Sequence, residues 1–227
     1  MELKNISYYF DLDGFAHREL LEGHEYVWGF LKILPEYIEK KLKELGAGVH
    51  GTVMDGAFVD KNVHLGKGSI VQPGAWVAGP AIIGENCEIR HGAYVGANTI
   101  TGNNAVIGHA SEVGNCVFLD GARAPHFAFV GHSVLGRNVN LGAGMKLSNL
   151  KVAMDEIVID GIKTGLTKIG ALIGDGSSLG CNSVSQPATF LGKNVYSYPL
   201  ALLRGFIASE TIVKVRQTQE EAALVKK

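Results

Sequence analysis

The chain has 227 residues, 46% of them hydrophobic, and a formal net charge of −1. This length and apolar content suffice for one main domain with a continuous core plus shorter appendages. A charge so close to zero, without a basic stripe or polybasic tail, argues against binding to nucleic acid or to an anionic membrane. No stretch approaches the roughly eighteen apolar residues of a membrane span, and we expect neither a span nor a signal peptide.

The three cysteines, Cys87, Cys116 and Cys181, lack the short spacings of a metal site and cannot all pair with one another. We therefore expect free thiols, no bound metal, and a protein of the reducing cytoplasm.

The first 47 residues differ from the rest in pattern. Residues 6–10 predict a short strand, and the sequence Phe-Asp-Leu-Asp-Gly that ends at Gly14 resembles the nucleophile loop of haloacid-dehalogenase-type phosphatases. That family needs alternating strands and helices downstream, and none are predicted here. The alternative is that Asp11 or Asp13 caps the next helix.

An apolar helical period runs from Phe15 to Leu45. Because proline disfavours the helical conformation of the residue before it, we expect a second helix to start at Pro35. The segment 1–47 then either caps the first coil of the domain that follows or holds a partner subunit.

From Val53 to Leu119 an aliphatic residue returns at every sixth position, with Thr101 as the one exception in kind. The series comprises Val53, Val59, Leu65, Val71, Val77, Ile83, Ile89, Val95, Thr101, Ile107, Val113 and Leu119, with small residues four positions after each, up to Val117. Six is a multiple of the strand period and fits no helix, so these side chains leave short strands on one face. The repeat predicts a parallel β-helix over residues 48–200.

Two interruptions are expected. The register is lost through residues 121–126 and returns at Leu135, and a second break covers about residues 148–169, with a tight hairpin at 157–162. Loops at such breaks are free of core packing and can carry function. Residues 201–227 are expected to form a C-terminal tail.

The segment from Pro125 to Leu150 carries a recognisable motif. It contains Pro-His-Phe-Ala-Phe-Val-Gly-His-Ser, then Asn-Leu-Gly-Ala-Gly-Met and a closing Asn-Leu. This block resembles the acetyltransferase domain of bifunctional N-acetylglucosamine-1-phosphate uridylyltransferase/glucosamine-1-phosphate acetyltransferase, and of archaeal-type sugar-1-phosphate nucleotidylyltransferases. The resemblance implies a left-handed β-helix of the hexapeptide acyltransferase type, acetyl-CoA as cosubstrate, an amino-sugar phosphate as acceptor, and a homotrimer.

The resemblance also implies roles for individual residues. His126 takes the place of the general base, because an attacking amine must lose its proton and imidazole titrates near neutral pH. The implied substrate-binding residues are Arg90, Phe129, Asn140 and Lys168, and the implied acetyl-CoA-binding residues are Ala143, Asn149, Leu150 and Cys181.

Several positions depart from the family pattern. Phe129 stands where a tyrosine is usual, and His132 replaces an aspartate. Gly114 falls near the position at which the bacterial form of the family has a phosphate-contacting lysine. No Gly-rich nucleotide loop precedes the β-helix, so the uridylyltransferase half is not expected. The acceptor can be glucosamine 1-phosphate, galactosamine 1-phosphate, another amino sugar or a nucleotide-linked one.

Two other functions are kept as alternatives. The altered phosphate contacts fit a non-catalytic β-helix that serves assembly or regulation. His91 and His109 are eighteen residues apart and stack on adjacent coils, which resembles the zinc-binding γ-class carbonic anhydrases. The closely spaced histidine pair of that family is missing.

Overall fold

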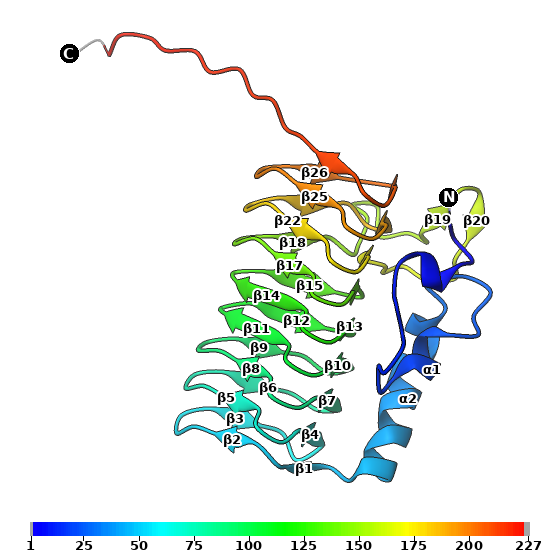
Figure 1. Ribbon diagram of the computed structural model, residues 1–227, viewed down its shortest axis with the longest axis vertical. Helices are drawn as coiled ribbons and strands as arrows, with labels where there is room; N and C mark the ends of the chain where they lie inside the picture. The colour runs from blue at the N-terminus through cyan, green and yellow to red at the C-terminus, as the bar shows by residue number, and fades with distance from the viewer. Residues whose placement is uncertain (1, 225–227) are drawn as a thin grey trace.

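The computed structural model describes residues 2–224 and is a left-handed parallel β-helix with helices along one side (Figure 1). Sheet A consists of β1 Gly48–Val49, β4 Val63–Leu65, β7 Ala81–Ile83, β10 Thr99–Thr101, β13 Cys116–Phe118, β16 Val134–Leu135, β21 Ala171–Ile173, β24 Thr189–Leu191 and β27 Phe206–Ile207. Sheet B consists of β2 Thr52–Val53, β5 Ile70–Val71, β8 Glu88–Ile89, β11 Val106–His109, β14 Arg123–His126, β17 Asn140–Leu141, β22 Ser178–Leu179, β25 Tyr196–Ser197 and β28 Ile212–Val213. Sheet C consists of β3 Phe58–Val59, β6 Trp76–Val77, β9 Tyr94–Val95, β12 Glu112–Gly114, β15 Phe129–Gly131, β18 Lys146–Leu147, β23 Val184–Ser185 and β26 Leu202–Leu203.

The predicted register is correct up to Val113, and its side chains line the interior of the coil from Leu65 onward. Beyond it, the interior positions belong to Phe118 and Cys116, whereas Val117 and Leu119 pack outside against the N-terminal segment. The predicted positions of Val117 and Leu119 are therefore wrong. One residue is missing from the corner after Val113, and a shift of one residue along a strand moves each side chain to the other face.

The expected loss of register at 121–126 is also wrong. The chain continues there as β14, with the small interior residues Ala122 and Ala124 fully buried. Ala124 pairs with Ile107 and occupies a position where the repeat elsewhere has a larger aliphatic residue, so the sequence pattern is lost while the coil persists.

Sheet A differs from the other two sheets because both of its faces are buried. Its outward side chains, including Ile82, Ile100 and Leu172, join a second apolar cluster with the N-terminal residues. Helix α1 spans Arg18–Leu21 and helix α2 spans Phe30–Leu45, which lies against β4 and β7 (Figure 1). The helices cover a face of the β-helix and not the open end of its first coil, so the expectation of an end cap is wrong.

Helix α2 runs through Pro35, contrary to the expected break. Proline at this position removes one hydrogen bond, to the carbonyl of Leu31. The buried stripe Phe30, Leu34, Ile38 and Leu42 packs as one face along sheet A and outweighs this loss. No helix in residues 2–224 combines the length and the apolar run that crossing a membrane requires.

The segment before α1 is a short 3₁₀ helix, Ile6–Tyr8, and not the expected strand. Neither aspartate of the Asp-Leu-Asp-Gly sequence caps α1, whose N-terminal cap position is His17. Instead, the Asp175 carboxylate accepts the backbone N–H groups of Asp11 at 2.6 Å and Arg137 at 2.7 Å. These two bonds join the segment to the β-helix.

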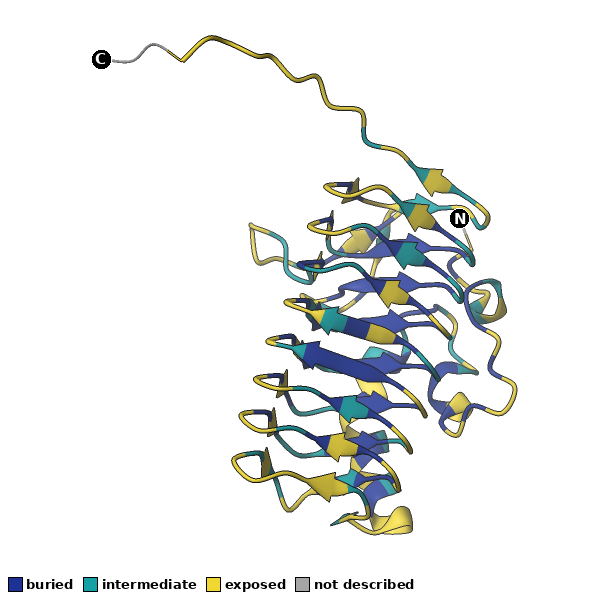
Figure 2. Ribbon diagram, turned by 60° about the vertical axis from the view of Figure 1, so that its left-hand side comes forward, coloured by how far each residue is buried: buried dark blue, intermediate teal, exposed yellow. Residues whose placement is uncertain are grey.

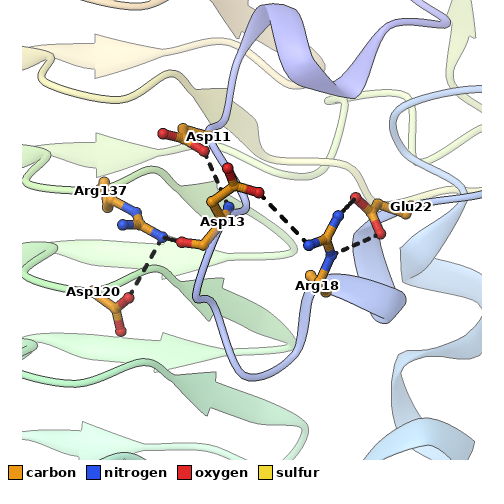
Figure 3. A network of polar contacts seen from close by, with 6 residues as sticks. All are labelled: Asp11, Asp13, Arg18, Glu22, Asp120 and Arg137. Carbon is orange, nitrogen blue, oxygen red and sulfur yellow. Dashed lines mark hydrogen bonds and ion pairs between the residues drawn. The ribbon is translucent and has the colours of Figure 1, made fainter.

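Arg137 completes this junction (Figure 3). Its guanidinium donates to the backbone carbonyl of Asp13 and forms an ion pair with Asp120 at 3.8 Å. Burial raises the pKa of Asp175, whose bonded carboxylate thus lies in a poorly solvated place. The aspartates therefore anchor the N-terminal segment to the β-helix.

The predicted hairpin is confirmed as β19 Val158–Ile159 paired with β20 Ile162–Lys163, joined by Asp160 and Gly161 at positive φ.

The β-helix extends to β28 Ile212–Val213, so the boundary expected at residue 200 is too early. Residues 220–224 contain no helix, and residues 225–227 lie outside the described residues. Figure 2 shows that the first coils are far more exposed than those in the middle of the stack.

The tight packing of the interior can be tested by a substitution at Ala105, whose side chain is only 1% exposed. Ala105→Leu adds bulk to a filled corner and should lower the free energy of unfolding by about 1–3 kcal/mol. Thermal and denaturant unfolding measure the change, with Ala153→Leu in an exposed loop as the control. Equal unfolding midpoints in wild type and Ala105→Leu would contradict this packing.

Candidate functional site

Two successive corners between sheet C and sheet A, in the middle of the stack, are one residue shorter than the regular six-residue step. Successive interior residues are five positions apart in sequence from Val113 to Phe118 and again from Val130 to Leu135. A single residue at positive φ makes each turn, Asn115 at 50° and His132 at 52°. The chain leaves the coil for the 148–169 excursion at the same corner, one coil further on.

These shortened corners border a cavity of about 290 Å³. Its lining combines the outward ends of sheet C, the two short corners, and both ends of the excursion: Tyr94, Gly96, Ala97, Glu112, Val113, Gly114, Asn115, Phe129, Gly131, His132, Asn149 and Lys168. We call this cavity the corner pocket. Its volume is suited to a small molecule of the size of a sugar.

His132 is the half-buried imidazole of the corner pocket. The side-chain amide nitrogen of Asn149 lies 3.0 Å from its Nδ1 and donates to it, so the neutral ring carries its proton on Nε2. Burial, with a smaller contribution from the Lys168 ammonium, lowers the pKa of His132 to about 4. At neutral pH this ring is therefore a hydrogen-bond donor and a weak base.

The corner pocket contains both signs of charge. Glu112 lies on the outer face of sheet C between Tyr94 and Phe129, its direct neighbours on the adjacent strands. Lys168 comes from the end of the excursion, where it forms an antiparallel bridge with Leu150. A ligand with a cationic and an anionic group finds a complementary partner for each.

The structure brings together three of the implied site residues, Phe129, Asn149 and Lys168, in the corner pocket, and Leu150 lies beside them. Sequence reasoning did not place Tyr94 or Glu112 in a site. The five-residue steps could have indicated this place, because a shortened corner in a strict repeat marks a local departure from regular packing.

A second group lies at the corner between sheets B and C. The carbonyl of His126 accepts the N–H of Gly144 at 2.9 Å, and the carbonyl of Ala143 accepts the N–H of Asn182 at 2.8 Å. His126, Ala143 and Cys181 therefore occupy equivalent positions on three successive coils. We call this row the corner column.

The remaining two implied residues lie apart from both groups. Asn140 is exposed on the outer face of sheet B, opposite Arg123. Arg90 directly follows β8, two coils before β14, and its guanidinium pairs with Glu88 at 2.8 Å. The structure therefore does not place Arg90 beside His126.

Within a single chain, His126 does not line the corner pocket. It ends β14 at one corner of sheet C, whereas the pocket lies at the opposite corner, beyond β15. Among residues 2–224, no three potential ligands gather closely enough to hold a metal ion. The stacked pair His91 and His109 supplies two imidazoles only.

The Lys168 ammonium can be tested as a cause of the low pKa of His132. In Lys168→Met this pKa should rise, because a nearby positive charge is lost, but it should stay below 6.5, because burial is the larger cause. NMR titration of the imidazole measures it, with Lys193→Met, outside the pocket, as the control. An unchanged pKa in Lys168→Met would show that the two groups do not interact.

The sequence relatives of this chain are bifunctional proteins that are much longer than the matched segment. The bifunctional sugar-1-phosphate nucleotidylyltransferase/acetyltransferase of Sulfurisphaera tokodaii is 31% identical over 107 residues, covering 45% of this chain and 27% of that protein. The bifunctional protein GlmU of a Synechococcus species is 37% identical over 79 residues, covering 35% of this chain and 14% of that protein. The chain thus spans about a quarter or less of the length of these two relatives.

Solved structures give distant similarities. A mutant perosamine N-acetyltransferase from Caulobacter crescentus, in complex with CoA and GDP-perosamine, has 16% identity and a TM-score of 0.34, with 68% of this chain and 59% of that chain covered. AntD, an N-acyltransferase from Bacillus cereus, has 12% identity and a TM-score of 0.38, with 82% and 88% covered. Neither similarity supports an argument about function.

The family-level comparison is more extensive. The family model described as the GMPPB C-terminal domain matches residues 77–220, which is more than half of the chain and includes both the corner pocket and the corner column. The chain therefore belongs to the GMPPB C-terminal domain family.

Proposed function

We propose that the protein is an acetyl-CoA-dependent N-acetyltransferase that acts on an amino-sugar phosphate such as glucosamine 1-phosphate, with His126 as general base. One observation carries the proposal. His126, Ala143 and Cys181 lie far apart in sequence, yet they stack in the corner column on successive coils. A base and two proposed acetyl-CoA contacts thus share one edge of the molecule. The similarity to the bifunctional sugar-1-phosphate nucleotidylyltransferase/acetyltransferase of Sulfurisphaera tokodaii supports this proposal.

The reaction forms a bond between the acceptor nitrogen and the acetyl carbon and breaks the bond from that carbon to sulfur. His126 is exposed at the end of β14, so a substrate amine can reach it. Its imidazole removes a proton from the nitrogen during attack and returns it to the CoA thiolate. Ala143, Asn149, Leu150 and Cys181 are the proposed acetyl-CoA contacts.

The corner pocket is the proposed acceptor site. Lys168 is the one cation among its lining residues in the described chain and faces the sugar phosphate in this proposal. Phe129 offers a ring face without the hydroxyl of the usual tyrosine, which removes one hydrogen bond of about 1 kcal/mol. Asn140 and Arg90 would contribute only after side-chain movement or from a neighbouring subunit. The three free thiols agree with a cytoplasmic setting.

The corner column and the corner pocket lie at opposite corners of sheet C, so a single site that uses both of them requires a second chain. In a homotrimer, the corner column of one subunit would face the corner pocket of the next and complete the site. Trp76 and Phe127, which are 48% and 56% exposed, are available for such a contact. Phe118 also lies outside the register predicted from the sequence, which made it a third candidate for this interface. It is fully buried in the core and cannot contribute.

The trimer is tested by light scattering at micromolar protein concentration. We expect three times the monomer mass of 24.2 kDa. Trp76→Ser should weaken the assembly, because it removes apolar contact area, whereas Val152→Ser in an exposed loop should not. A wild-type monomer at this concentration would contradict the shared site.

His126→Ala tests the general base. Acetyl transfer, followed as free thiol in a screen of amine acceptors with acetyl-CoA, should fall roughly a hundredfold to ten-thousandfold, while acetyl-CoA binding persists. The matched variant is His132→Ala, which should lose much less because His132 is held as a hydrogen-bond donor.

A reversed order, with turnover abolished in His132→Ala and kept in His126→Ala, would refute the assignment of the base. Absence of both turnover and acetyl-CoA binding in the wild type would favour the non-catalytic assembly or regulatory module. The Arg90–Glu88 ion pair is the observation that favours this second candidate, because it leaves an implied phosphate contact already neutralised.

A further inference from the structure

Two histidines, His91 and His109, form an ordered stack on the two coils that precede His126. The rings of His91 and His109 are nearly parallel, with an angle of 7° and centroids 5.3 Å apart. Nδ1 of His91 lies 2.7 Å from the carbonyl oxygen of Pro73, and Nδ1 of His109 lies 2.8 Å from the carbonyl oxygen of His91. Each ring is thereby tied to the backbone of the preceding coil.

These bonds determine which ring nitrogen carries the proton. A carbonyl oxygen can only accept, so Nδ1 of each ring must be the donor. In the neutral ring, the lone pair is then on Nε2. The edge-to-face contact of His109 with Phe127, at 5.2 Å and 77°, further restricts its ring. His109 is therefore built as a proton acceptor, the opposite of His132, whose Nε2 carries the proton.

His109 and His126 are direct neighbours. They pair across β11 and β14 and so occupy the same position on adjacent coils. The ring of His126 forms no hydrogen bond to any residue in the described part of the chain, whereas His109 is held. The proposed base thus has a second imidazole one coil away, and only this second ring has a tautomer set by the backbone.

The chemistry of the proposed function leaves a task for this second imidazole. An alkyl amine arrives as an ammonium ion, and its nitrogen must lose two protons to become an amide, one before it attacks and one during or after attack. One of these protons ends on the CoA thiolate and the other in solvent. A single imidazole would have to release the first proton before it could take the second.

Resting on the proposed function, we propose that His109 Nε2 removes the first proton, from the acceptor ammonium, and that His126 removes the second during attack. The free amine then adds to the thioester carbonyl, the carbon–sulfur bond breaks, and the His126 imidazolium protonates the departing thiolate. His109 returns its proton to solvent. The sum is ammonium plus thioester giving amide, thiol and one proton.

The test compares His109→Asn with His91→Asn. The asparagine amide nitrogen can replace Nδ1 as the donor to the backbone carbonyl. Both variants therefore keep the local bond and lose the stacked ring pair, but only His109→Asn removes the Nε2 next to His126. With an amino-sugar phosphate acceptor at neutral pH, kcat/KM should fall roughly a hundredfold in His109→Asn and less than twofold in His91→Asn. With a weakly basic acceptor such as an aryl amine, already neutral at this pH, the loss in His109→Asn should disappear. His126→Ala should remain impaired with both acceptors.

Several outcomes would overturn the assignment. An equal loss with both acceptors would mean that His109 is structural, and an unchanged rate would mean that it takes no part. An Nε2–H tautomer of His109 in ¹⁵N NMR spectra of the whole protein would also refute it, independently of activity. If the wild type transfers no acetyl group to any amine, the proposed function fails and the assignment with it. If the wild type is active and His109→Asn is equally active, only the assignment fails.

Discussion

The constraint on which this structure depends is the vertical register between coils. Within sheets A, B and C, each inner strand pairs in parallel with the strands one coil above and one coil below, so each side chain stands over an equivalent one. Interior positions therefore form mostly apolar columns, and the polar residues that enter them usually have a hydrogen-bond partner, with the hydroxyl of Ser185 as an exception. Thr101, for example, is 1% exposed and its hydroxyl accepts the N–H of Gly84 at 3.0 Å.

The same register creates the candidate site, because it turns sequence-distant residues into rows along an edge. The corner column arises without any special loop. The corner pocket has another origin, since two corners are one residue short and the chain then leaves the coil at the next one. The regular repeat therefore aligns the corner column, and the departures from the repeat form the corner pocket.

Hydrogen-bond partners, and not residue type, decide what the histidines can do. His132 accepts a hydrogen bond from an amide nitrogen at Nδ1 and is a donor through Nε2, whereas His109 donates to a carbonyl through Nδ1 and is an acceptor through Nε2. The N-terminal helices cover sheet A and leave the faces of sheets B and C uncovered. Any site that uses these histidines is therefore confined to the two exposed sheets and their corners, where a neighbouring subunit can approach.

The sequence by itself determined the β-helix, its interior register up to Val113 and the hairpin with its Asp-Gly turn, because all three follow from local period and turn chemistry. It also indicated the motif from Pro125 to Leu150. It failed at Val117 and Leu119, since a one-residue deletion changes which face a side chain takes without changing its apolar character. It failed at Pro35, where packing of α2 on sheet A overrides a local preference.

Only the tertiary structure decided how the implied site residues are distributed. It divided them between the corner pocket and the corner column, and it left Arg90 paired with Glu88. It also assigned the tautomers of His109 and His132. These properties depend on contacts between residues that are one coil or more apart, and such contacts are set by the stacking of the coils and not by the residues adjacent in sequence.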